Sequence, residues 1–149
     1  MDQFVEILLI EDNLDEAQLV IRSLKKSNLA NRLMHIDDGA EALDFLFTRG
    51  KYSDRQADNQ PRLVLLDLKL PKVDGLEILK QIKENESTRT IPVIVLTSSR
   101  EEHDVLKSYS LGVNSYIVKP VSFDSFAKAV VELGLYWMVL NVNPNSTAK

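Results

Sequence analysis

The chain contains no cysteine, so disulfide bonds, zinc sites built on thiolates and cysteine nucleophiles are excluded. It also has no apolar run long enough to cross a bilayer, and its first residues lack the basic and apolar pattern of a signal peptide. We therefore expect a cytoplasmic protein without a membrane partner.

Glycine is scarce, and the net charge is negative. The chain has five glycines, and no glycine-rich phosphate loop follows the first predicted strand, residues 5–10. This argues against a nucleotide or flavin binder. The net charge of -4 argues against nucleic acid as a direct partner, because neutralising phosphates requires a concentrated basic face.

The rest of the composition is that of an ordinary globular protein. With 149 residues, of which 44% are hydrophobic and 27% charged, the chain fits one domain. We expect this domain to span residues 1–142, and residues 143–149 to form a flexible tail.

Five short apolar segments predict buried β-strands, and each is followed by apolar residues at helical spacing. The strands are predicted at residues 5–10, 33–36, 63–66, 91–96 and 115–118. Strict alternation of strands and helices predicts an α/β fold, a doubly wound (βα)5 parallel sheet with helices on both faces. The polar residues 48–62 predict a long surface loop. His35 has no second histidine nearby in the sequence, so we interpret it as a strand residue and not as a ligand.

Polar side chains follow four of the five predicted strands. Sites in a parallel α/β sheet form beyond the carboxyl ends of the strands. The residues at these ends are Glu11 and Asp12, Asp67, Thr97, and Lys119. Three carboxylates in one cleft repel one another unless a cation joins them, and Mg²⁺ suits such hard oxygen ligands.

This set of residues can support phosphoryl chemistry. A carboxylate beside a divalent cation can attack phosphorus and form an aspartyl phosphate. The charge on the phosphoryl oxygens would then be shared by the cation, a lysine ammonium and a hydroxyl donor. Asp67, Lys119 and Thr97 supply the nucleophile, the ammonium and the hydroxyl.

Four motifs in this order resemble the receiver domain of two-component response regulators, of the CheY-like single-domain type. They are Glu11-Asp12, the segment Leu66-Asp67-Leu68 with Leu70-Pro71-Lys72-Val73-Asp74-Gly75, Thr97-Ser98, and Lys119-Pro120. The resemblance covers the whole chain. It implies a flavodoxin-like sheet of strand order 2-1-3-4-5 and a role in phosphorelay signal transduction.

The resemblance also implies a metal site. Asp12 and Asp67 would bind Mg²⁺ directly, together with the backbone carbonyl of Lys69, and Glu11 would act mainly through a metal-bound water.

The resemblance further makes Asp67 the phosphoacceptor for a sensor histidine kinase. Lys119 would pair with the phosphoryl group, Thr97 would move toward it, and Tyr116 would change rotamer with it. A cis Lys119–Pro120 bond is implied as well. The side chains two residues beyond Asp67 and Thr97, Lys69 and Ser99, are expected to tune the lifetime of the phosphorylated state.

The segment 133–140 is apolar nearly all round, although a helix on a domain surface should keep one polar face. We expect it to join the fourth helix, the fifth strand and the fifth helix in a surface for homodimerisation or partner binding, although an extra core layer is the alternative. The loop at 50–61 and the Tyr136-Trp137 pair are similar to regulators paired with phytochrome-type sensor kinases.

Two other functions compete with a phosphoacceptor that is not itself an enzyme. A magnesium-dependent aspartyl-phosphate phosphatase would generally carry a second aspartate two residues after the nucleophile, where Lys69 stands. A phosphorylation-independent binding module would act through the apolar segment 133–140 alone.

Overall fold

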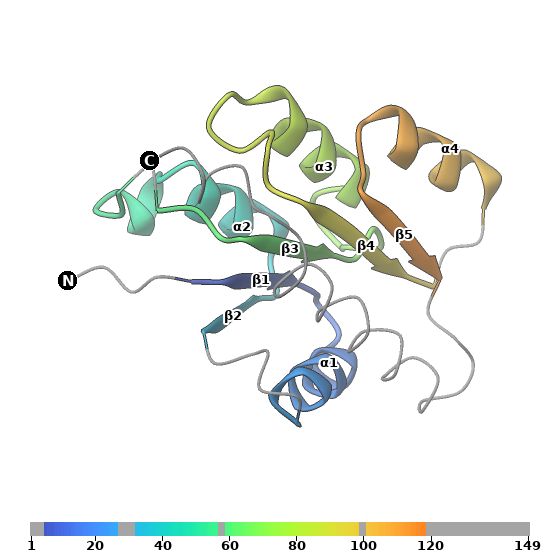
Figure 1. The fold of residues 1–149 in the computed structure, drawn as a ribbon, viewed down its shortest axis with the longest axis horizontal. Helices are drawn as coiled ribbons and strands as arrows, with labels where there is room; N and C mark the ends of the chain where they lie inside the picture. Colours follow the sequence, from blue (N-terminus) through green and yellow to red (C-terminus); the bar gives the residue numbers. More distant parts are fainter. Residues whose placement is uncertain (1–4, 27–31, 57–58, 99–100, 119–149) are drawn as a thin grey trace.

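The computed structural model describes residues 5–26, 32–56, 59–98 and 101–118 (Figure 1). Its strands are β1 (Ile7–Ile10), β2 (Leu33–Ile36), β3 (Leu63–Leu66), β4 (Val93–Thr97) and β5 (Ser115–Val118). Its helices are α1 (Leu14–Lys26), α2 (Gly39–Leu46), α3 (Gly75–Glu84) and α4 (Glu102–Ser110), and a short 3-10 helix, η1, spans Gly50–Tyr52. The predicted fifth helix, the segment 133–140 and the tail lie outside the described residues.

The five strands form one parallel sheet in the order β2-β1-β3-β4-β5. This confirms the predicted doubly wound α/β fold. Helices α2, α3 and α4 lie on one side of the sheet and α1 on the other (Figure 1).

Alternate residues of each central strand belong to two separate apolar cores. Leu8 and Val64 pack in the core beneath α2 and α3, while Ile7 and Leu63 pack in the core against α1. The strands are therefore buried on both faces, which is why they are continuous apolar runs and do not alternate with polar residues.

Side chains cap the N-terminal ends of α1 and α3. Asn13 accepts a hydrogen bond from the Glu16 amide at 3.0 Å at the start of α1. Asp74 accepts one from the Leu76 amide at 3.1 Å at the start of α3. Both satisfy amides that have no partner within the helix.

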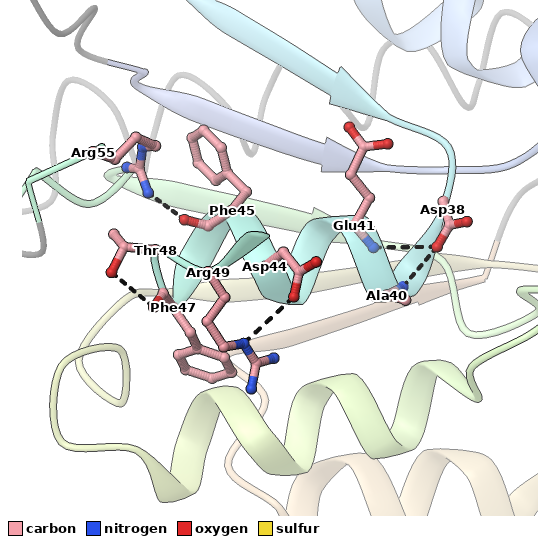
Figure 2. A network of polar contacts seen from close by, with 9 residues as sticks. All are labelled: Asp38, Ala40, Glu41, Asp44, Phe45, Phe47, Thr48, Arg49 and Arg55. Atoms are coloured by element: carbon pink, nitrogen blue, oxygen red, sulfur yellow. Dashed lines mark hydrogen bonds and ion pairs between the residues drawn. The ribbon is translucent and has the colours of Figure 1, made fainter. Parts of the chain in front are cut away.

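The segment between α2 and β3 was predicted as a polar surface loop, but it contains η1 and is tied to α2 (Figure 2). The Arg55 guanidinium lies 3.7 Å from the centre of the Phe45 ring and donates to the Phe45 carbonyl. Gln60 donates from Nε2 to the Leu46 carbonyl at 2.7 Å. These donors add hydrogen bonds to the last carbonyls of α2, of which that of Phe45 also accepts from the Thr48 amide at 3.4 Å.

Within the described residues, no helix is both long enough and apolar enough to cross a membrane.

Candidate functional site

Three carboxylates come together at the carboxyl end of the sheet. Strands β1 and β3 are paired with Ile10 opposite Leu66, so the residues that follow each strand lie side by side. One carboxylate oxygen from each of Glu11, Asp12 and Asp67 lies within 4.8 Å of the others. Glu11 is 3% and Asp67 5% exposed, whereas Asp12 is exposed. The predicted clustering of these three residues is confirmed.

The backbone of Glu11 is fixed to the neighbouring strand at both of its polar groups. Its amide donates to the Ile36 carbonyl at 3.2 Å, and its carbonyl lies 2.7 Å from Nε2 of His35. A carbonyl can only accept a hydrogen bond, so Nε2 must carry the proton. His35 is a strand residue, as predicted, but no pattern in the sequence indicates its contact with the Glu11 carbonyl.

The loop after β3 is held close to Asp67 by its own backbone. The Lys69 amide donates to Oδ1 of Asp67 at 3.0 Å, and the Asp67 amide donates to the Ile10 carbonyl at 3.0 Å. The Gly75 amide donates to the Leu68 carbonyl at 3.2 Å. A Cβ on Gly75 would lie 2.4 Å from the Leu68 Cα, so this close approach requires glycine.

Two ion pairs join this loop to its neighbours. Lys69 Nζ lies 3.5 Å from Oδ2 of Asp104 on α4, and Lys72 Nζ lies 3.8 Å from Oδ2 of Asp38 before α2. A cavity of about 420 Å³ adjoins the first pair and one of about 440 Å³ adjoins the second. The second cavity is also lined by Asp12, so the acidic cluster borders solvent-accessible space.

The other predicted site residues belong to β4 and β5. Leu66 pairs with Val95, which puts Thr97, the last residue of β4, at the same edge of the sheet as Asp67. Thr97 is fully buried. Tyr116 is half-buried in β5, opposite Val95. Lys119, Ser99 and the Lys119–Pro120 bond lie outside the part of the chain that the structure describes.

The donor set fits a hard divalent cation. Three carboxylate oxygens converge, two of them from buried side chains, and such groups need a cation to offset their mutual repulsion. Oxygen ligands next to an open cavity suit Mg²⁺ or Mn²⁺, which commonly keep bound waters.

Sequence comparison finds relatives that match nearly the whole chain. Residues 7–131 match the response regulator receiver domain. The chain is 41% identical over 132 residues to response regulator Rcp1 of Synechocystis sp., covering 89% of this chain and 88% of that protein. It is 43% identical over 143 residues to the probable methanogenesis regulatory protein FilR2 of Methanothrix harundinacea, covering 96% of this chain and 89% of that one.

Solved structures with a similar fold are also response regulators. The phosphorylated cyanobacterial phytochrome response regulator RcpA superposes with a TM-score of 0.87 at 34% identity, over 95% of this chain and 99% of that one. The Mn²⁺-bound form of Rcp1 gives a TM-score of 0.86 at 39% identity, over 94% and 99%. The chain therefore belongs to the response regulator receiver domain family of two-component signalling proteins, and phytochrome response regulators are among its relatives.

Proposed function

We propose that Asp67 accepts a phosphoryl group from a phosphohistidine of a sensor kinase. The observation that carries this proposal is the buried Asp67 carboxylate, which lies within 4.8 Å of two further carboxylates at the edge of the sheet. Burying like charges together is unfavourable for the fold, and clusters of this kind are found at functional sites.

The chemical step needs few protein groups. A carboxylate oxygen of Asp67 attacks phosphorus, the new O–P bond forms, and the P–N bond to the kinase imidazole breaks, leaving its electron pair on nitrogen. The hydrogen bond from the Lys69 amide orients the carboxylate before the attack.

The metal in this proposal is Mg²⁺, held by Asp12, Asp67 and the Lys69 carbonyl, with Glu11 acting through water. When bound, it would neutralise charge on the carboxylates and on the phosphoryl oxygens. Among solved relatives, the Mn²⁺-bound form of Rcp1 supports a divalent metal in such a site.

The response to phosphorylation would pass through three residues. Thr97 would donate its hydroxyl to a phosphoryl oxygen, Lys119 would pair with the phosphoryl charge, and Tyr116 would change rotamer. The burial of Thr97 at the edge that bears Asp67 supports its role.

We propose that the changed surface consists of α4, β5 and the fifth helix, and that it mediates homodimerisation and partner binding together with the segment 133–140. Leu106 and Tyr109, three residues apart on α4, are exposed apolar side chains on this surface. The relatives named for phytochrome signalling support a phytochrome-type kinase as the donor. We place this activity in the cytoplasm, within a domain of residues 1–142 followed by a flexible tail.

The family and the residues of the site favour a signalling role over an enzymatic one. Receiver domains are generally signalling proteins, and we infer only magnesium-dependent self-phosphorylation and autodephosphorylation here. A phosphatase would need an acid two residues after Asp67, but that position is Lys69, whose ammonium is paired with Asp104.

Intact-mass analysis after incubation with acetyl phosphate tests the proposal. A single phosphoryl adduct should appear with Mg²⁺, be absent without it, and be absent from Asp67→Asn. Asp74→Asn is the matched control, because Asp74 is an exposed aspartate of the same loop and asparagine can still cap α3. Phosphate release is followed in parallel to detect an adduct that turns over quickly. If the parent chain shows neither an adduct nor Asp67-dependent phosphate release, the proposal is wrong.

A further inference from the structure

Lys69 contacts two acidic residues through different groups. Its backbone amide donates to Oδ1 of Asp67, and its ammonium lies 3.5 Å from Oδ2 of Asp104. One residue therefore joins the proposed phosphoacceptor to α4.

The two partners in the ion pair differ in their freedom to move. The Asp104 side chain is 11% exposed and belongs to the first turn of α4, where the helix dipole favours a negative charge. The Lys69 side chain is 53% exposed and has a flexible four-carbon stem. Since Asp104 is fixed in the helix, the ammonium is the mobile partner.

A phosphoryl group on Asp67 would change the balance of charge around this ammonium. The phosphoryl group carries close to two negative charges in place of the single charge of the Asp67 carboxylate, about twice the charge of Asp104, and it lies two residues away along the chain from Lys69. The ammonium would then be attracted away from α4.

We propose that Asp104 is a positioning residue for phosphoryl transfer: it holds the Lys69 ammonium on α4, and a phosphoryl group on Asp67 competes with it for that ammonium. The coupling free energy between the two events is the same in both directions. If phosphorylation weakens the ion pair, the intact ion pair makes phosphorylation less favourable by the same amount. The first turn of α4 is thereby coupled to the state of Asp67. This inference rests on the proposed function.

The test uses beryllofluoride with Mg²⁺ as a probe for the phosphoryl group, and its affinity is measured by ¹⁹F NMR in the full chain. Asp104→Asn removes the competing charge, so the dissociation constant should fall about two- to fivefold, the range expected for a partly exposed ion pair. Lys69→Met should weaken binding by a similar factor.

The double variant separates positioning from a general effect on the fold. If Asp104 acts only through the Lys69 ammonium, Asp104→Asn should have no effect on affinity in the Lys69→Met background. Asp104→Glu should restore the parent affinity. Asp38→Asn, which removes the charge paired with Lys72 but can still cap α2, should leave the affinity unchanged.

The outcomes are distinct. No beryllofluoride binding by the parent chain contradicts the proposed function itself. Two outcomes overturn this inference alone. In the first, the parent and Asp104→Asn bind beryllofluoride with the same affinity. In the second, Asp104→Asn changes the affinity by the same factor in the parent and in the Lys69→Met background. If Asp104→Asn does not fold, the comparison of Lys69→Arg with Lys69→Met tests the inference. Lys69→Arg should retain the parent affinity for beryllofluoride, and an equal loss of affinity in both variants overturns the inference.

Discussion

Replacing Gly75 with alanine should damage the site without changing a polar side chain. Gly75 is the first residue of α3, and its Cβ would lie 2.4 Å from the Leu68 Cα and 2.7 Å from the Asp67 carbonyl oxygen. Both are backbone atoms, so neither can rotate away. The added methyl group must push α3 and the loop after Asp67 apart.

The size of the effect follows from that overlap. The methyl carbon is about 1 Å short of ordinary van der Waals separation, and overpacking of this kind destabilises a fold by about 1–3 kcal/mol. The displacement also strains the hydrogen bond from the Gly75 amide to the Leu68 carbonyl, which contributes about 1 kcal/mol. Alanine recovers less than about 1 kcal/mol through its helix propensity. We expect a net loss of about 1–4 kcal/mol.

Gly39 offers a matched control. It is also the first residue of a helix and also follows a capping aspartate, Asp38. Its nearest contact for a new Cβ is the Ile78 Cδ1 methyl at 2.7 Å, the far end of a flexible side chain, and the next is the Val73 Cβ at 3.2 Å, which needs a shift of only a few tenths of an ångström. Because that methyl can rotate away, Gly39→Ala should change the free energy of unfolding by less than about 1 kcal/mol.

Urea denaturation followed by far-ultraviolet circular dichroism measures both variants. Phosphorylation by acetyl phosphate, measured where both are folded, should fall more in Gly75→Ala than in Gly39→Ala, because the displaced backbone bears Asp67. Equal free energies of unfolding for the two variants would refute the argument that backbone contact at Gly75 fixes the loop.

Three further predictions concern other parts of the fold. Thr48 has a φ of 52° at the end of α2, a conformation that suits glycine, so Thr48→Gly should stabilise the chain by about 1 kcal/mol and raise its melting temperature by about 2–4 °C. Burial lowers the pKa of Lys83 from 10.5 to about 8, so the unfolded chain binds more protons between those pH values and stability should rise with pH across that window. The urea midpoint, measured at several pH values, should rise with pH in the parent chain and should not show this rise in Lys83→Met. His35→Ala should weaken Mg²⁺ affinity, measured by isothermal titration calorimetry, about tenfold, because the Glu11 carbonyl loses its donor, and His35→Gln should restore much of it.

The sheet and the acidic cluster could be predicted because they depend on local patterns and one topological rule. Apolar runs buried on both faces predict central parallel strands, and parallel strands end at one edge. Glu11, Asp12 and Asp67 each follow such a run, so their proximity needed no knowledge of packing. The motif order then indicated the family that the comparisons show.

Contacts between distant side chains could not be predicted in this way. Arg55 and Gln60 lie in a polar stretch, and only the folded chain shows that they bind the carbonyls of Phe45 and Leu46. The contact of His35 with Glu11 depends on how β1 and β2 are paired. Such contacts are set by register and packing, which leave no periodic signal in the sequence.

Lys69 shows why the same residue can be predicted in part and missed in part. The family resemblance implies a metal-binding role for its carbonyl, which stays a prediction, whereas its ammonium pairs with a residue on α4 whose placement no local pattern indicates. The structure then distinguishes rigid from movable parts of the site. Gly75 and the Asp67 amide hold the loop through backbone contacts, whereas the link to α4 runs through a flexible side chain. Added charge at Asp67 can therefore move the Lys69 ammonium more easily than it can displace the backbone of the loop. We expect phosphorylation to affect α4, through the ion pair, before it affects α3.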